Sequence, residues 1–513
     1  MGSILALNIS IMTHKVLIAN RGEIAIRIAR TCKRVGTKPC GIYSDADKES
    51  LHLKFCDETI NIGGLTPLQS YLDVDKVIDA ANRLGCDMIH PGYGFLAEST
   101  NFAKRCKEKG IIFVGPSADV MAISGDKVRA RNMASKIASI VPGGEVSNEK
   151  QAFSLAYEIG FPVILKAVEG GGGRGLRILR SAKELKERFL SAQTESMMSF
   201  GSKRLYIEQY LENPKHIEVQ IIADKADVVQ LRERECSIQR RHQKLIEETP
   251  SPALKDKMRQ DILSEAVSIM KELRYDNAGT VEFLFKSNKY FFMEVNARIQ
   301  VEHPVTELVT GVDIVEQQLR AALGQGLSVK QEMILSKGHA IECRINAEHP
   351  LNFAPISGEV NKFVAPVGDG IRVDSALYSG YSIPPFYDSL IAKLICHGSD
   401  RKEAIYRMNS ALATFRISGI PTSIPFHISA LRDVRFVDGT YDTSFADNVK
   451  FYSSKVGELA AAILAVISKR SMPKTVYVKQ VLKKDDDPWN VSRFDWTDPY
   501  DTHLPAQTFR WKI

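Results

Sequence analysis

Three polar side chains occur at alternate positions in an otherwise apolar stretch of this chain. Residues 291–304 read FFMEVNARIQVEHP, and the first part of this segment has the composition of a buried β-strand. Side chains alternate between the two faces of a strand, so Glu294, Asn296 and Arg298 point one way, about 7 Å apart per step. The apolar residues around them are expected to face a core: Met293, Val295 and Ala297.

This row of side chains suits the binding of a metal ion together with an anion. Carboxylate and amide oxygens are ligands that Mg²⁺ or Mn²⁺ prefers when the ion is held against phosphates. A guanidinium group can bind a planar anion through two parallel hydrogen bonds. Charged groups on a buried strand cost free energy unless a ligand uses them. Glu294, Asn296 and Arg298 therefore predict a site where a metal and an anion meet.

A second strand is expected to bring another carboxylate to this site. Residues 280–285 are β-branched and aromatic apart from Glu282, and the polar residues 287–289 separate them from 290–296. This pattern predicts a hairpin that sets Glu282 beside Glu294, where the two carboxylates could bridge one or two metal ions. The alternative is that Glu282 is a solvated edge residue and that Glu294 pairs with Arg298.

A glycine-rich segment offers a place for phosphates. Residues 170–175 read GGGGRG and follow a predicted strand that ends at Lys166. Glycines let backbone N–H groups approach phosphates because no Cβ atom stands in the way. A run of glycines is also typical of a flexible turn, so this segment gains weight only from its position after the strand.

The composition describes an ordinary globular protein. Its 513 residues correspond to about three domains, and hydrophobic residues make up 44% of them. The net charge of +7 is spread along the chain without a long basic block, which favours anion chemistry in a cleft over nucleic-acid binding. A mildly basic surface without a function explains this surplus equally well.

Cysteine usage and hydropathy indicate a cytoplasmic protein that does not insert into a membrane. None of the eight cysteines forms a C-x-x-C pair, so we expect reduced thiols, with Cys236 and Cys343 as buried packing residues. No apolar run reaches membrane-spanning length, and residues 1–11 lack the basic start of a signal peptide.

Six segments in a fixed order resemble the biotin carboxylases, which are members of the ATP-grasp superfamily. The resemblance extends from about Lys15 to about Phe451, and its most specific part is EVNARIQVEH at 294–303. The other segments are ANRGEIA at 19–25, HPGYGFL at 90–96, GGGGRG at 170–175, RECSIQRRHQK at 234–244 and ECRINAE at 342–348.

The resemblance implies an α/β protein with an ATP-grasp fold, a Rossmann-like domain before it and an α+β biotin carboxylase domain after it. Strands alternate with helical stretches in the first domain, but it lacks G-x-G-x-x-G, so we expect no dinucleotide there. The expected divisions are 1–14 (extension), 15–125 (Rossmann-like domain), 126–348 (ATP-grasp domain, lid at about 140–208), 349–451 (C-terminal domain) and 452–513 (extension).

The resemblance also implies a nucleotide site. Lys127 and Lys166 are expected to bind the phosphates of ATP, and residues 205–211 to form a strand behind the adenine. Gln209 stands where many relatives carry Lys, but the contact there is made by the backbone. The full expected set is Lys127, Lys166, Gly172, Gly173, Glu208, Gln209, Tyr210, Leu211, His216, Gln239, His242, Glu282, Leu284 and Glu294, with Asn296 as a further metal ligand.

Bicarbonate and biotin are expected on the other side of the metal. The implied bicarbonate site comprises Lys244, Arg298, Gln300, Val301 and Glu302. Glu302 is the candidate general base, although a salt bridge with a nearby arginine is an alternative role. Arg344 is expected to stabilise the enolate oxygen of the biotin ureido ring, and Tyr93 to line the biotin cleft.

The expected partners follow from what the chain lacks. No Ala/Val-Met-Lys-Met tetrapeptide is present, so we expect biotin on a separate biotin carboxyl carrier protein. A separate carboxyltransferase subunit would complete an acyl-CoA carboxylase, and relatives suggest a homodimer.

The alternatives to this function are an ATP-grasp enzyme that activates bicarbonate for an amine, as carbamoyl-phosphate synthases do, and a catalytically silent nucleotide-binding scaffold. The tail carries Trp489, Trp496 and Trp511, which could dock on a partner or on the chain itself.

Overall fold

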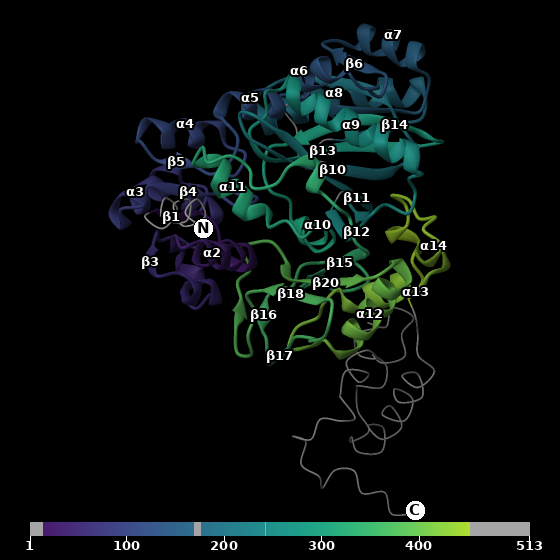
Figure 1. Cartoon of the computed structure of the whole chain (residues 1–513). Coiled ribbons are helices and arrows are strands. Elements are labelled where there is room, and N and C mark those ends of the chain that lie inside the picture. Colours follow the sequence, from purple (N-terminus) through teal and green to yellow (C-terminus); the bar gives the residue numbers. More distant parts are fainter. Residues whose placement is uncertain (1–13, 169–175, 242, 452–513) are drawn as a thin grey trace, which may run out of the picture.

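The computed structural model describes residues 14–168, 176–241 and 243–451 (Figure 1). The predictions for Gly172, Gly173 and His242 therefore lie outside the described residues, as do those for the tryptophan-bearing tail and nearly all of the N-terminal extension. The mixed α/β class predicted from the sequence is confirmed.

A parallel sheet forms the N-terminal region, seen at the left of Figure 1. Its strand order is β3-β2-β1-β4-β5. Helix α2 begins at Gly22, whose φ of +64° suits a residue without a side chain, and ends before Gly36 in the left-handed region. The elements are β1 (Lys15–Ile18), α2 (Gly22–Val35), β2 (Lys38–Tyr43), β3 (Glu58–Asn61), α3 (Val74–Leu84), β4 (Met88–His90), α4 (Thr100–Glu108) and β5 (Ile112–Phe113).

A separate antiparallel sheet, in the order β6-β9-β7-β8, occupies the predicted lid. Apolar side chains of its strands pack with Leu185 and Phe189 of α8 and Ala152 and Ala156 of α7. The glycine-rich segment connects β7 to β8. The elements are β6 (Gly143–Val146), α7 (Glu149–Ile159), β7 (Val163–Ala167), β8 (Arg177–Leu179), α8 (Ala182–Phe200) and β9 (Leu205–Gln209).

An eight-stranded antiparallel sheet, in the order β14-β13-β10-β11-β12-β15-β20-β18, joins the centre of the chain to its C-terminal part. Its last two strands belong to the region predicted to follow residue 348, so the sheet runs across that predicted domain boundary. Its strands are β10 (Lys215–Ala223), β11 (Val228–Arg240), β12 (Gln243–Thr249), β13 (Asn277–Lys286), β14 (Lys289–Asn296), β15 (His339–Asn346), β18 (Ile371–Ser375) and β20 (Leu390–Gly398).

Helices cover this sheet, and the largest described core cluster packs α12 and α13 against β15 and β20. The remaining helices are α5 (Ala118–Gly125), α6 (Lys127–Ala134), α9 (Asp256–Glu272), α10 (His303–Thr310), α11 (Ile314–Ala322), α12 (Arg401–Thr414), α13 (Ile424–Arg432) and α14 (Val434–Val437). Two small sheets pair β16 (Gly358–Glu359) with β19 (Ser382–Ile383) and β17 (Lys362–Val364) with β21 (Arg416–Ser418). Among the described helices, none combines the length and the apolar character that crossing a bilayer requires.

Candidate active site

One cleft of about 1330 Å³ gathers side chains from the N-terminal sheet, the lid and the eight-stranded sheet. Every described residue that the sequence predicted for the site lines it. These residues are Tyr93, Lys127, Lys166, Glu208, Gln209, Tyr210, Leu211, His216, Gln239, Lys244, Glu282, Leu284, Glu294, Asn296, Arg298, Gln300, Val301, Glu302 and Arg344. Their individual roles remain predictions, but the structure brings them together.

The predicted hairpin is confirmed, including its register. Strands β13 and β14 are antiparallel neighbours, with Glu282 opposite Glu294, so the two carboxylates share one face of the sheet. The expectation that Met293 faces the core is wrong, because this residue is only half-buried and lies outside the core cluster that contains Val295 and Ala297. The register shifts beside it, since Phe283 pairs with Phe292, and an extra residue on one strand changes the alternation of faces.

Arg298 lies just after β14 and has several polar partners. Its Nε donates to Oε2 of Glu98 at 3.1 Å, and its Nη1 donates to Oε1 of Gln300 at 2.7 Å. Among the described residues, the ion pair of Arg298 is thus with Glu98 and not with Glu294, which was the alternative partner. Glu98 also accepts the backbone N–H of Ala297 at 3.0 Å, so it holds two consecutive residues of the segment after β14.

Lys244 stands among three carboxylates. Its Nζ lies 2.7 Å from Oε1 of Glu302 and 3.0 Å from Oε1 of Glu282, and it also contacts Glu218. Burial opposes the charged ammonium, but these three negative charges outweigh burial and raise the pKa of Lys244 well above its usual value. Lys244 therefore stays protonated and serves as a fixed positive charge.

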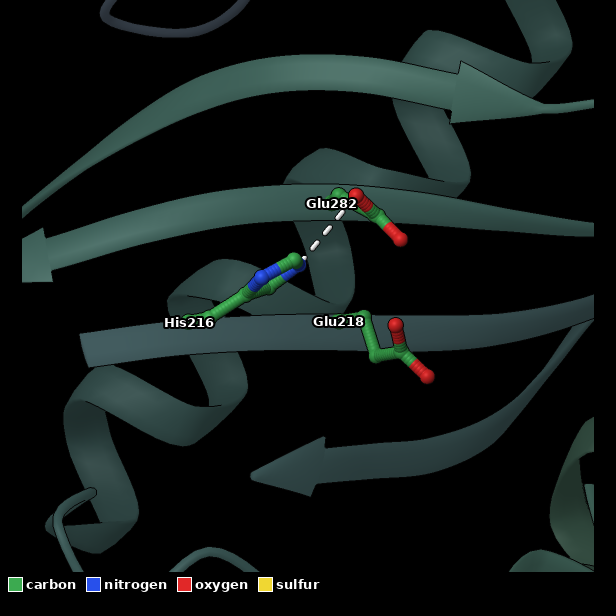
Figure 2. A group of neighbouring side chains, drawn as sticks. All are labelled: His216, Glu218 and Glu282. Carbon is green, nitrogen blue, oxygen red and sulfur yellow. Dashed lines mark ion pairs between the residues drawn. The ribbon is translucent and has the colours of Figure 1, made fainter. Parts of the chain in front are cut away.

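Figure 2 shows how two neighbouring strands supply this acidic group, with His216 and Glu218 on β10 and Glu282 on β13. The Nε2 atom of His216 lies 3.2 Å from Oε2 of Glu282. Glu218 is fully buried, and its Oε1 accepts from Nε of the fully buried Arg234 at 2.5 Å. Arg234 thereby compensates part of the negative charge of Glu218. Without Arg234, the single charge of Lys244 would have to balance Glu218 together with Glu282 and Glu302.

Glu302 lies between two cations. Its carboxylate accepts from Lys244 at 2.7 Å and from Nη2 of Arg344 at 3.0 Å, and the residue is 1% exposed. Burial would raise the pKa of this carboxyl, but Lys244 and Arg344 outweigh it and hold the pKa well below its usual range. The alternative role predicted from the sequence, a salt bridge with an arginine, is thus present. A carboxylate held in this way is ionised, and it becomes a stronger base when an anion draws one of its cations away.

The side of the cleft formed by the β6-β9-β7-β8 sheet carries a smaller ionic group. Nζ of Lys166 donates to Oε1 of Glu208 at 2.6 Å, and Nη1 of Arg131 lies 3.1 Å from Oε2 of Glu208. Burial lowers the pKa of Lys166, although Glu208 opposes this shift. Lys127 is the first residue of α6, after Asp126, whose side chain caps the helix. Two lysines on different elements therefore reach the same cleft, as expected for phosphate ligands.

The carboxylates on β13 and β14 fit a divalent cation. Desolvation and the negative charge of Glu282 raise the pKa of the half-buried Glu294, so ionisation of both carboxyls places two like charges beside each other. A divalent ion bound by Glu282, Glu294 and the amide oxygen of Asn296 would neutralise these charges.

Glu294→Gln is expected to have opposite effects on metal dependence and on metal-free stability. It removes a metal ligand, so the Mg²⁺ concentration for half-maximal activity should rise about tenfold or more. In the wild type, the pKa of Glu294 is raised, so its ionised form disfavours the folded state at pH 7. The uncharged glutamine of the variant should therefore raise the Tm in metal-free buffer. Glu265→Gln, which alters the partner of Tyr290 outside the cleft, is the control and should leave Mg²⁺ dependence unchanged. A lower metal-free Tm for Glu294→Gln would contradict this account.

Several residues of the site were missed by sequence reasoning. Glu218 had a detectable signal, since His216, Glu218 and Gln220 alternate with apolar residues on β10 in the same manner as the polar row on β14. Glu23 and Arg234 lie within two of the segments that carry the family resemblance, 19–25 and 234–244, but were given no role there. The others had no local signal because their partners are far away in the sequence: Glu98, Arg131, Glu247 and Lys393.

Glu247 is one of the missed residues that touch the predicted machinery. Its Oε1 accepts from Nε of Arg344 at 2.5 Å. Burial raises the pKa of Glu247 to about 7, although Arg344 opposes the shift. Arg344 therefore lies between two carboxylates, Glu247 and Glu302, which fix the direction of its guanidinium.

Comparison with known proteins covers most of the chain. Family models match in the order "Biotin carboxylase, N-terminal domain" at 12–121, "Carbamoyl-phosphate synthase L chain, ATP binding domain" at 126–330 and "Biotin carboxylase C-terminal domain" at 342–448. Biotin carboxylase 1 of Bacillus subtilis (strain 168) is 50% identical over 443 residues, which are 85% of this chain and 98% of that protein.

Solved structures resemble the chain in the same region. The biotin carboxylase of Campylobacter jejuni, in a β-γ-ATP complex, gives a TM-score of 0.82 at 44% identity and covers 84% of this chain and 98% of its own. The biotin carboxylase domain dimer of Hydrogenobacter thermophilus 2-oxoglutarate carboxylase, in complex with MgADP, ADP and bicarbonate, gives 0.81 at 46% identity, covering 84% and 97%.

Proposed function

The chain belongs to the biotin carboxylase family and is an ATP-dependent ligase that carboxylates biotin with bicarbonate, and we propose that its biotin is carried on a separate carrier protein. This reaction is the first half-reaction of a biotin-dependent carboxylase. The observation that best supports the catalytic assignment is the position of Glu302. It lies between Lys244 and Arg344 in the cleft that also contains Arg298 and the paired carboxylates.

In the proposed sequence of steps, Arg298 and Lys244 hold bicarbonate, and Glu302 removes its proton. The bicarbonate oxygen then attacks the γ-phosphate of ATP, which yields carboxyphosphate and ADP. Mg²⁺ bound to Glu282, Glu294 and Asn296 would neutralise charge on the phosphates. The arrangement supports this order, because an anion that draws Lys244 toward itself leaves Glu302 more basic.

The second part of the proposed reaction takes place beside Arg344. Carboxyphosphate yields CO₂ and phosphate, and the phosphate takes the proton from N1 of biotin. The resulting ureido enolate faces Arg344, whose guanidinium stays charged throughout, and N1 captures CO₂ to give carboxybiotin. Glu247 and Glu302 supply the two contacts that orient Arg344 toward the cleft.

An ADP-release assay with substrate omissions tests this function. We expect ADP formation to require bicarbonate and to increase when free biotin is added, whereas ammonia should not replace biotin. Stimulation by ammonia would favour an enzyme of the carbamoyl-phosphate type. ATP binding without bicarbonate- and biotin-dependent ADP release would favour a silent scaffold.

We further propose that the carboxyl group passes to an acyl-CoA on a carboxyltransferase subunit. A second acceptor class is supported by one relative, the domain from 2-oxoglutarate carboxylase, which indicates that similar subunits serve a 2-oxo acid. Supplying the carrier protein with either type of carboxyltransferase would separate the acyl-CoA acceptor from the 2-oxo acid acceptor.

We also propose that the protein is a homodimer, since that relative is described as a dimer. We propose a cytoplasmic location as well, since all eight cysteines are free and seven are buried.

A further inference from the structure

The fully buried ammonium of Lys393 lies where three parts of the chain meet. Lys393 is on β20, its Nζ donates to the carbonyl oxygen of Val301 at 3.0 Å, and its side chain is 0% exposed. The same Nζ lies 3.1 Å from Oε1 of Glu23 in the first turn of α2 and 3.9 Å from Oδ2 of Asp374 on β18. A charge buried to this extent is costly, so its contacts must hold it firmly.

On the N-terminal side, this ammonium acts on a residue that lines the cleft. The Tyr93 hydroxyl donates to Oε1 of Glu23, the atom that also contacts Lys393. Lys393 Nζ lies 5.8 Å from the centre of the Tyr93 ring. Oε2 of Glu23 is buried and has no hydrogen-bond partner among the described residues. The Tyr93 hydroxyl is therefore held by a carboxylate that, in the part of the chain the structure describes, forms its ion pair with Lys393.

On the central side, Lys393 acts together with Arg344. The two residues are directly opposite each other on the antiparallel strands β15 and β20. Arg344 donates to the carboxylate of Glu302 at 3.0 Å, and Lys393 donates to the carbonyl of the preceding residue, Val301. Two neighbouring cations thus hold two consecutive residues of the segment predicted to bind bicarbonate. Lys393 orients the peptide that joins Val301 to Glu302.

We propose that Lys393 is a positioning residue that fixes the biotin-facing Tyr93 and the bicarbonate-facing Val301–Glu302 peptide in one common geometry. Glu23 transmits its effect on one side, and the Val301 carbonyl transmits it on the other. Lys393 and Glu23 act through other groups. This inference rests on the proposed function, because it assigns Tyr93 to the biotin side of the cleft and Glu302 to the bicarbonate side.

Glu23→Gln tests the biotin side. The amide keeps the shape of the side chain but weakens the charged contacts to Lys393 and Tyr93. Loss of a charge-assisted hydrogen bond is expected to raise KM for free biotin about tenfold, while KM for bicarbonate and for ATP stays within about twofold. Tyr93→Phe should raise KM for biotin to a similar extent. If Glu23 acts through Tyr93, the double variant has the KM of the single variants, because there is one shared interaction to lose.

Lys393→Met tests both sides and should raise KM for biotin and for bicarbonate together. Arg401→Met is the matched control, because it removes a cation from the buried Glu248 outside the cleft. It should lower Tm and leave every KM unchanged. If Lys393→Met does not fold, the Glu23→Gln and Tyr93→Phe cycle still tests the biotin side, and failure there overturns the common geometry of the two sides.

Two outcomes separate failure of the inference from failure of the proposed function. Wild-type protein without biotin-stimulated ADP release would overturn the proposed function itself. If the wild-type protein is active, two results would overturn only the positioning role. One is an unchanged KM for biotin in Glu23→Gln, and the other is full additivity of the effects of Glu23→Gln and Tyr93→Phe.

Discussion

Glu302→Gln is expected to lower kcat for biotin-stimulated ADP release by about 10²- to 10⁴-fold, which is the usual contribution of a general base. The amide has nearly the same size, and its one oxygen can still accept from Lys244 or from Arg344, but it cannot take the proton of bicarbonate. ATP should bind with nearly unchanged Kd, because Glu302 lies on the anion side of the cleft. The measurements are steady-state ADP release and nucleotide binding at equilibrium.

A matched control for this variant is Glu248→Gln. Glu248 is also a buried carboxylate with two basic partners, His339 and Arg401, whose hydrogen bonds lower its pKa to about 2 against the effect of burial. It does not line the cleft. Glu248→Gln should therefore reduce stability but leave kcat unchanged. Normal turnover in Glu302→Gln would refute its assignment as the base.

Lys244→Met is expected to destabilise the fold by about 3–5 kcal/mol at pH 7, because it leaves buried carboxylates without their shared cation. Activity should be lost as well, since the predicted bicarbonate site loses a positive charge. Urea unfolding at several pH values measures the effect on stability. Lys289→Met, which changes an exposed lysine at the hairpin turn, should have the stability of the wild type.

The contribution of Glu282 and Glu302 to the pH dependence of stability should have the opposite sign in this variant to that in the wild type. In the wild type, Lys244 holds the pKa values of Glu282 and Glu302 below their usual range against burial. Their contribution to stability is therefore present above the unfolded pKa of about 4.3 and is lost as pH falls through the lower folded values. Without Lys244, burial and mutual repulsion raise the folded pKa of these groups, so stability should increase as pH falls from 7 toward 5. Parallel stability profiles for the two proteins would contradict this explanation.

Local periodicity was sufficient to predict the centre of the site. The alternation of residues in 280–296 depends only on neighbours along the chain, and both the hairpin and the pairing of Glu282 with Glu294 are confirmed. The ordered motifs also predicted the family and which side chains would line one cleft. The exception within the hairpin, Met293, arises because a register shift depends on how two strands pair and not on either strand alone.

By itself, then, the sequence determined the fold class, the family and a large set of residues that line the cleft, since these depend on short patterns and on the order of motifs. Only the tertiary structure decided which charges compensate one another. Lys393 meets Glu23 from 370 positions away, and Arg298 meets Glu98 from 200 positions away. Such pairs leave no periodic trace, because they form where separate sheets and helices pack, and burial there makes each charge depend on a partner that the local sequence does not contain.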